Sequence, residues 1–322
     1  MNNRNKESKL KNLQAKMEIK PEEVAVSLEA FIRQYVEELE REGVVLGLSG
    51  GVDSAVVAAL CKGAVGPEKT LALIMPEKDS NKEQAEDALV LAEELGIKAR
   101  LIDITPYLKK LGVYKLFPLN KPLLPKKLKE IMVRRAYKYY QKKTGETPFA
   151  ASLGGLKDKD FSAYLKMSNA YYRAKHRLRM LLLYLEGEKE NRLVVGAANK
   201  SEWLVGFFVK YGCDAAADIM PLLNIYKTQV RELARYLNVP GRIIDKAPSP
   251  DIIPGLTDEK ALAISYEKLD LILAALEEGW EVPEIVEALD AAGITGEQII
   301  EVKKLVEKSA HMRKLYWPEL GT

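Results

Sequence analysis

The sequence predicts an α/β fold in which helices cover both faces of a doubly wound, mostly parallel sheet, with a helical segment at the C-terminal end. Strand-like and helix-like patterns alternate between residues 44 and 104, which is typical of parallel strands joined by right-handed crossovers. A glycine-rich turn at residues 49–54 separates the first strand of this series from its first helix. Ligands of such sheets bind beyond the carboxyl ends of the strands, so this turn marks the expected binding site.

Apolar periodicity assigns the elements in chain order. Residues 1–20 are polar and mostly basic, and we expect a loose tail or a frayed helix ahead of one domain that spans residues 21–322. Short apolar runs predict strands at residues 44–48, 70–76, 99–104 and 192–196. Helical spacing predicts helices at residues 22–42, 81–95, 163–186, 226–237 and 257–273, followed by a helical, polar remainder. Pro21 and Thr257 occupy favourable positions at two helix starts.

Residues 113–160 interrupt the alternation and are expected to form a basic insert, helical between residues 126 and 143. They contain four prolines, and twelve Lys or Arg residues stand against four Asp or Glu residues, with tyrosines interleaved. Such a surface can bind a nucleic-acid backbone. We expect a solvated helical face or a subunit contact, and the basic insert leaves nucleic-acid binding open as the alternative.

Composition indicates an ordinary globular protein, with 47% hydrophobic and 30% charged residues. The formal net charge of +3 is too small to indicate a nucleic-acid partner. Cys61, Cys213, His176 and His311 are too few and too scattered for a Cys/His zinc site or a redox pair. No segment has the apolar length of a signal peptide core or a membrane span, so we expect a cytoplasmic protein without a membrane partner.

The turn at residues 49–54 has the chemistry of a phosphate site. Gly50 and Gly51 let the backbone approach an anion, and Asp53 and Ser54 stand in a first helical turn, where N–H groups favour a phosphate. Because the Asp53 carboxylate would repel that phosphate, we expect Mg²⁺ between the two. The turn lacks the Gly-Lys-Ser/Thr of a P-loop and the Gly-x-Gly-x-x-Gly of a dinucleotide site. An ordinary strand-to-helix turn with a capped helix is the alternative.

The run Ser49-Gly-Gly-Val-Asp-Ser54 is the signature of the ATP pyrophosphatases, and further motifs in order resemble one branch of them, the ammonia-dependent NAD synthetase family. The resemblance covers residues 25–318 apart from the insert. Its motifs lie at residues 47–54, 175–180, 195–202, 206–212, 226–230, 257–259 and 264–266, together with Asp218 and Pro221. It implies a Rossmann-like sheet of the adenine nucleotide hydrolase type and a homodimer formed through helices near residues 163–186.

The resemblance also implies a reaction, ATP-dependent amidation of deamido-NAD to NAD with ammonia. In the family, the nicotinate carboxylate of deamido-NAD attacks the α-phosphate of ATP, pyrophosphate leaves, and ammonia then displaces AMP from the acyl adenylate. Such chemistry requires phosphate clamps, Mg²⁺ and exclusion of water more than an acid/base pair. The shortage of histidine is therefore compatible with this function.

Individual residues receive roles from the same resemblance. Asp53 and Glu202 would bind Mg²⁺, and Asp53 and Lys227 are the candidate catalytic residues. Surface positions for Glu202, Arg177 and Lys227, and a plain connecting loop around Ser249, are the alternatives. Lys210, Asp214 and Asp218 would line the acceptor side. Contacts to ATP would come from Gly47, Ser49, Gly50, Gly51, Val52, Asp53, Ser54, Arg177, Lys227 and Ser249.

Several positions depart from the family pattern. Val209 replaces a threonine, an extra residue stands around Cys213, and alanines at residues 215–217 replace glycines. Ala197 and Leu256 replace a threonine and a glutamine. Because these changes fall mainly on the acceptor side, ATP use is better supported than the identity of the acceptor.

Two other functions stay open at this point. Sulfur-transferring ATP pyrophosphatases adenylate RNA or a small substrate and carry sulfur on cysteine, and Cys213 near a basic insert would suit them. They need a second cysteine at the site, whereas Cys61 is expected in the core. The other possibility is a non-catalytic ATP-binding protein, against which the intact Asp53, Glu202 and Lys227 argue.

Overall fold

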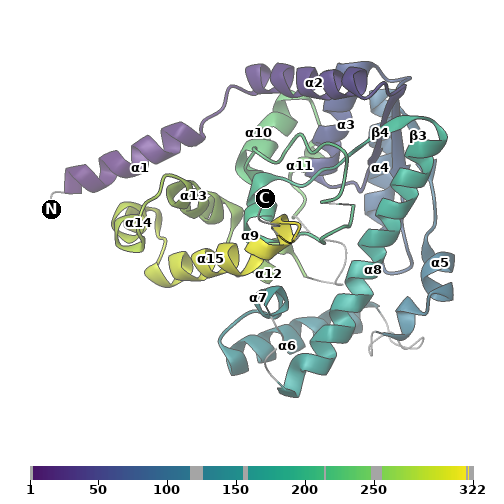
Figure 1. Ribbon diagram of the computed structural model, residues 1–322. Helices are drawn as coiled ribbons and strands as arrows, with labels where there is room; N and C mark the ends of the chain where they lie inside the picture. The colour runs from purple at the N-terminus through teal and green to yellow at the C-terminus, as the bar shows by residue number, and fades with distance from the viewer. Residues whose placement is uncertain are drawn as a thin grey trace.

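The computed structural model describes residues 3–116, 126–154, 159–213, 215–247, 256–316 and 318. Within them, four parallel strands form one sheet in the order β3-β2-β1-β4, which confirms the predicted fold class (Figure 1). The strands are β1 (Gly43–Gly47), β2 (Thr70–Ile74), β3 (Lys98–Leu101) and β4 (Arg192–Val195). Strands β2 and β3 extend from one edge of β1, and β4 lies at its other edge. A crevice at such a reversal of strand order is where sheets of this kind bind ligands.

Helices cover both faces of the sheet, as expected for a doubly wound arrangement (Figure 1). Val44 and Leu46 of β1 face α2, α3 and α10, whereas Val45 faces α8. This alternation is the period of two of a strand that is buried on both sides. The helices named here and below are α1 (Asn3–Met17), α2 (Pro21–Glu38), α3 (Val52–Val65), α4 (Lys82–Leu95), α5 (Thr105–Lys110), α6 (Lys126–Thr144), α7 (Pro148–Leu153), α8 (Lys159–Lys189), α9 (Lys200–Val205), α10 (Lys227–Tyr236), α11 (Gly241–Ile244), α12 (Asp258–Leu262), α13 (Tyr266–Glu277), α14 (Val282–Leu289) and α15 (Gly296–Ser309), with short 3₁₀ turns η1 (Val113–Lys115), η2 (Asp290–Ala292) and η3 (Ala310–Arg313).

A second apolar core lies among α9, α13, α14 and α15, beside the sheet domain (Figure 1). Helix α1 packs on this core, although the sequence indicates only a loose tail or a frayed helix for residues 1–20. Leu13 is 1% exposed among residues of the second core, and the Gln229 side chain donates to the Met17 carbonyl oxygen at 2.9 Å. These tertiary contacts stabilise a polar helix that is too short to be stable alone.

The described part of the basic insert consists of α6 and α7. Tyr137 of α6 is buried against Leu256 and Ala261, and its hydroxyl donates to the Ala261 carbonyl oxygen at 2.8 Å. Burial raises the pKa of Tyr137 to about 12, so this hydroxyl keeps its proton. Helix α6 is therefore joined on one side to α12, in addition to presenting a basic outer face to solvent.

The predicted helix over residues 257–273 is wrong, because the chain forms two helices there. Helix α12 ends at Ala263, which has a left-handed backbone conformation with φ of 60°, and α13 starts after Ser265. In one continuous helix, residues 258 and 266 would lie about 12 Å apart along the axis. The break instead lets the buried Tyr266 hydroxyl donate to Asp258 Oδ2 at 3.1 Å.

The described helices include none with the length and apolar content that a bilayer crossing requires.

Candidate functional site

The glycine turn follows β1 and leads directly into α3. Gly50 has φ of +78°, and a Cβ atom there would lie 2.2 Å from the backbone oxygen of Gln84, so a glycine is required. The Ser49 and Ser54 hydroxyls lie 3.1 Å apart, and Ser54 Oγ donates to the Gly51 carbonyl oxygen at 3.0 Å. These bonds hold the turn open toward the N-terminus of α3, where anions are favoured.

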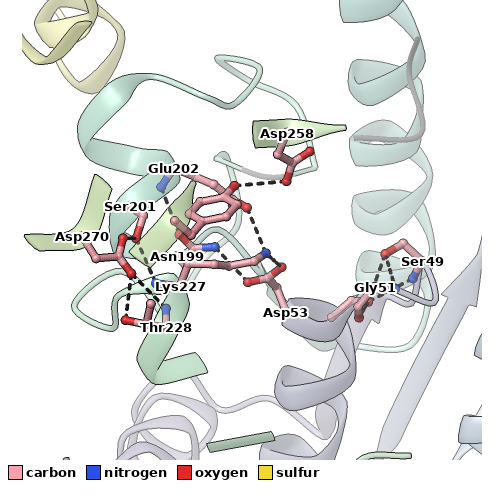
Figure 2. Close-up of polar contacts among 12 residues, drawn as sticks. Ser49, Gly51, Asp53, Asn199, Ser201, Glu202, Lys227, Thr228, Asp258 and Asp270 are labelled. Atoms are coloured by element: carbon pink, nitrogen blue, oxygen red, sulfur yellow. Dashed lines mark hydrogen bonds and ion pairs between the residues drawn. The ribbon is translucent and has the colours of Figure 1, made fainter. Parts of the chain in front are cut away.

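Three charged residues that the sequence singled out lie together beside this turn (Figure 2). Lys227, the first residue of α10, is 2% exposed and forms an ion pair with Asp53 in the first turn of α3. Its Nζ also lies 3.4 Å from Glu202 Oε1 on α9. Since α9 follows β4 and α3 follows β1, the two neighbouring strands bring these carboxylates to one edge of the sheet.

Asn199 links the two carboxylate-bearing helices. Its Oδ1 accepts from the Glu202 backbone N–H at 3.0 Å as the N-cap of α9, and its Nδ2 donates to Asp53 Oδ1 at 2.8 Å. The asparagine therefore fixes both the start of α9 and the orientation of the Asp53 carboxylate. The sequence analysis did not single out Asn199, although an Asn three residues before a Glu is a capping signal.

Several carboxylates surround the Lys227 ammonium. Burial opposes the charge of Lys227, but the carboxylates of Asp53, Glu202 and Asp258 together outweigh it and raise the pKa of the ammonium, which stays charged. Asp258 of α12 is 4% exposed, and burial raises the pKa of its carboxyl to about 6 despite the nearby Lys227. Within the described part of the chain, Asp258 Oδ1 has no hydrogen-bond partner. Asp258 stands in the family motif at residues 257–259, although the sequence analysis gave it no role at the site.

A cavity of about 650 Å³ opens in front of these groups. The glycine turn, Asp53, Glu202, Lys227 and Asp258 line its polar end. Helices α6, α7 and α8 line the rest with apolar and aromatic side chains, including Tyr140, Phe149 and Tyr172. The insert that interrupts the sequence pattern is thus one wall of the candidate site.

Arg179 is a cavity residue that sequence reasoning missed. It lines the large cavity and its Nε donates to the Met75 carbonyl oxygen at 3.1 Å, at the end of β2. Tyr172, His176 and Arg179 follow one another on α8 at spacings of four and three, and all line the cavity. Such spacing places residues on one helix face, and it is the signal that identifies Arg179.

A second, basic hollow of about 510 Å³ adjoins the first. Arg173, Arg177, Lys210, Lys308 and His311 contribute to its lining, and Arg173 lines both cavities. Arg177 donates from Nε and Nη2 to the Lys210 carbonyl oxygen at 3.3 Å, and Lys210 Nζ donates to the Lys314 carbonyl oxygen at 2.6 Å. The structure therefore places Arg177, expected at ATP, beside Lys210 and away from the glycine turn.

Asp218 does not line either cavity. Its Oδ2 accepts from the Val194 backbone N–H at 2.8 Å and its Oδ1 from the Tyr184 hydroxyl at 2.9 Å, so it joins β4 to α8. The expected site residues Asp214 and Ser249 lie outside the described residues.

The donor set at the glycine turn fits Mg²⁺. The carboxylates of Asp53 and Glu202 both approach the Lys227 ammonium, which neutralises part of their charge. Their oxygens are hard ligands. Mg²⁺ is commonly held by one or two carboxylates together with the phosphates of a substrate. In the described ranges no three or more His, Cys, Asp or Glu side chains form a metal cage, so phosphate oxygens would have to complete the coordination.

We expect Gly50→Ala to abolish most ATP binding. A left-handed alanine costs about 1–2 kcal/mol of stability, and the new Cβ must also displace the Gln84 backbone that borders the cavity. Gly96→Ala is the matched control, because Gly96 also has a positive φ, of +70°, but no atom lies within 4 Å of the added Cβ. Calorimetric titration with ATP should show a loss of at least about tenfold for Gly50→Ala alone. Equal ATP affinity in the two variants would contradict the assignment of the turn.

We expect Asp258→Asn to change how stability depends on pH. The folded protein holds the Asp258 proton up to about pH 6, above its ordinary pKa of 3.8, so the native state binds more protons in this window. The free energy of unfolding of the wild type therefore falls as pH rises through it, and the asparagine removes this loss. Relative to the wild type, the variant should gain up to about 3 kcal/mol between pH 4 and pH 7 in urea unfolding.

The exposed Asp290 supplies the control for that measurement, since Asp290→Asn removes a solvated carboxylate. The stability difference from the wild type should change with pH more for Asp258→Asn than for Asp290→Asn. The same pH dependence in the two variants would show that the Asp258 carboxyl is not perturbed.

Comparison with known proteins identifies the family. A family model described as NAD synthase matches residues 24–141 and 126–316. The chain is 43% identical over 288 residues to the NH(3)-dependent NAD(+) synthetase of Thermotoga maritima, covering 89% of this chain and 96% of that one. It is 39% identical to the corresponding Methanocaldococcus jannaschii protein, with 91% and 95% of the chains covered.

Solved structures agree with this match. An NMN synthetase from Francisella tularensis superposes with a TM-score of 0.66 at 28% identity, covering 94% of this chain and 99% of that one. An NH3-dependent NAD synthetase from Campylobacter jejuni, in complex with the nitrate ion, superposes with a TM-score of 0.61 at 29% identity and covers 94% and 100%. The extent of the model match and the identity over nearly whole chains show that this chain belongs to the NAD synthase family.

Proposed function

We propose that the chain catalyses the ATP-dependent amidation of deamido-NAD to NAD with ammonia, through an acyl adenylate, and releases AMP and pyrophosphate. The observation that carries this proposal is the meeting of Asp53, Glu202 and Lys227 beside a glycine turn, at the carboxyl ends of β1 and β4. The match to ammonia-dependent NAD synthetases over most of the chain supports it.

The chain's own groups suit the adenylation step. A carboxylate cannot exchange oxygen for nitrogen directly, because oxide is a poor leaving group, so the acid must first be activated as its AMP ester. Pyrophosphate, the leaving group of that step, would lie at the N-terminus of α3 and against the Lys227 ammonium, which remains charged through its carboxylate neighbours. The aromatic wall from α6, α7 and α8 would keep water away from the adenylate.

We propose that Asp53 and Glu202 hold Mg²⁺ together with the phosphate oxygens of ATP. The metal, when bound, supplies positive charge to the phosphates. Asn199 supports this arrangement from the protein side, because it orients Asp53 and caps the helix that carries Glu202.

The two adjoining cavities suggest how two substrates are placed. ATP would occupy the large cavity at the glycine turn, and the anionic acceptor would extend into the basic hollow around Arg177 and Lys210. Arg173, which lines both cavities, would lie where the reacting groups meet. On this proposal Arg177 binds the acceptor, and Arg179 lies in the cavity that binds ATP.

A mononucleotide acceptor is the second candidate. Four of the residues that depart from the family pattern, Ala197, Val209, Cys213 and Leu256, line the large cavity, and a structural relative with a TM-score of 0.66 is an NMN synthetase. The sulfur-transfer alternative has no support, because the family model and the relatives reported above are synthetases of NAD or NMN. Cys213 instead lies at the cavity wall with its Sγ 3.4 Å from His176 Nδ1.

The direct test is formation of NAD from deamido-NAD, ammonium and Mg-ATP, with AMP release measured in parallel. Asp53→Asn should retain the circular dichroism of the wild type but lose at least about 100-fold in turnover, because a charged oxygen ligand is removed without a change in shape. Cys213→Ser is the control and should retain turnover.

Three results would contradict parts of this proposal. Near-normal turnover in Asp53→Asn would rule out its assignment as a metal ligand, and an inactive Cys213→Ser would return sulfur transfer to consideration. Faster amidation of nicotinic acid mononucleotide than of deamido-NAD would make the mononucleotide the acceptor.

We further propose that the chain forms a homodimer through α8. Leu181 and Leu185 are 63% and 48% exposed, and their spacing of four places them on one helix face. Leu183 faces the opposite side of α8 and is buried against the sheet. An exposed pair of leucines on the helix that the family resemblance assigns to dimerisation supports this interface.

Leu181→Glu combined with Leu185→Glu should convert the dimer to monomers in sedimentation velocity, because charges replace the apolar contact. Leu111→Glu is the control, since Leu111 is 68% exposed and directly follows the last residue of α5. A wild-type chain that sediments as a monomer would contradict the proposal.

We also propose a cytoplasmic location. Cys61 and Cys213 form no disulfide with each other in the part of the chain that the structure describes, as is usual in a reducing compartment. Burial raises the pKa of the Cys61 thiol, so this residue is a core side chain without reactive character.

A further inference from the structure

Asp270 is a buried carboxylate that the chemistry proposed above does not use. It lies on α13, in the helical layer beside the sheet, and is 0% exposed. Its Oδ1 accepts from the Ser201 hydroxyl at 2.5 Å, and its Oδ2 accepts from the Thr228 backbone N–H at 2.9 Å and from the Thr228 hydroxyl at 2.8 Å (Figure 2).

The network continues to the site through Ser201. The Ser201 oxygen, which donates to Asp270, also accepts from the backbone N–H of Lys227 at 2.9 Å. Ser201 directly precedes Glu202 on α9, and Thr228 directly follows Lys227 on α10. The Asp270 carboxylate therefore accepts hydrogen bonds from Ser201, the neighbour of Glu202, and from Thr228, the neighbour of Lys227.

Two of these hydrogen bonds pair backbone N–H groups that have no partner within α10. Lys227 and Thr228 are the first two residues of α10, and their N–H groups have no acceptor within the helix. Ser201 and Asp270 accept from them, and the negative charge of Asp270 is favourable at that helix end. The N-terminal turn of α10 is thus fixed to α9 and α13 at once.

This arrangement does not maximise stability by itself. A buried carboxylate is costly even with partners, and burial raises the pKa of Asp270 to about 6. At a position that only had to fill the core, an uncharged side chain would cost less free energy of folding than a carboxylate. What the carboxylate adds is three acceptor bonds of defined direction to two helices.

We propose that Asp270 is a positioning residue that sets the distance between Glu202 and Lys227, and with it the placement of the Lys227 ammonium against Asp53. It does not touch substrate. The inference rests on the proposed function for its activity measurements, but binding of the leaving group tests it independently.

The sharpest comparison is between two buried serines, Ser201 in the first turn of α9 and Ser309 at the end of α15, which contacts the other end of α9. Ser201→Ala removes the link between Asp270 and Lys227. Ser309→Ala is the matched control, because Ser309 is also 0% exposed but donates to the Leu204 carbonyl oxygen at 3.0 Å, at the far end of α9. Both variants should lose thermal stability, and only Ser201→Ala should lose kcat, by about 10- to 100-fold, as expected for a misplaced clamp.

Asp270 variants provide a rescue series. Asp270→Asn can keep the bonds from Thr228 through its carbonyl oxygen while its amide donates to Ser201, so it should retain most of kcat. Asp270→Ala keeps none of these bonds and should lose kcat as Ser201→Ala does. The KM for the acceptor should stay near the wild-type value throughout, because the network does not reach the basic hollow.

Titration with inorganic pyrophosphate and Mg²⁺ separates this inference from the proposed function. Weaker pyrophosphate binding in Ser201→Ala than in Ser309→Ala supports the positioning role even if the wild type forms no NAD. Equal binding and equal kcat in the two serine variants would overturn it, as would a folded Asp270→Ala with wild-type values. A wild type that binds no pyrophosphate would overturn both proposals.

Discussion

The buried ammonium of Lys227 is the interaction on which the site depends. Asp53, Glu202 and Asp258 come from three different helices, and their negative charges would repel one another in a medium of low dielectric constant. Lys227 holds them together, and removal of one partner from such a buried pair costs about 3–5 kcal/mol. The proposed function assigns the same ammonium to the phosphates of ATP, so stability and the proposed binding would use one group.

The sheet explains why these residues can meet at all. Strands β1 and β4 are parallel neighbours, so the segments that follow them emerge side by side at one edge. The first segment is the glycine turn with Asp53, and the second is the cap of α9 with Asn199 and Glu202. Helix α10 then adds Lys227 across the gap. The helical layer completes the site from behind, since α12 supplies Asp258 and α13 supplies Tyr266 and Asp270.

The cavities divide the chemistry between two regions with different surroundings. The polar end at the glycine turn suits phosphates, the aromatic wall excludes water, and the basic hollow beyond Arg173 suits an anionic acceptor. The basic insert takes part in this division, because α6 and α7 form part of the wall and Tyr137 ties α6 to α12. On the proposed function, this segment would help to protect a water-sensitive adenylate.

Local pattern determined the centre of the site. The glycine turn, its flanking strand and helix, and the motifs that carry Glu202 and Lys227 are contiguous signals, and a parallel sheet has few ways to arrange them. Short apolar runs likewise located the four strands, because a strand buried on both faces, such as β1 or β2, is apolar at consecutive positions.

Tertiary structure decided what depends on contacts between distant segments. It placed Arg177 beside Lys210 and Arg179 against the end of β2, used Asp218 to join β4 to α8, and broke a helix at Ala263 so that the Tyr266 hydroxyl binds Asp258. Spacing along the chain does not predict the partners in these contacts. Each follows from packing and charge pairing between elements far apart in sequence, which only the folded chain brings into contact.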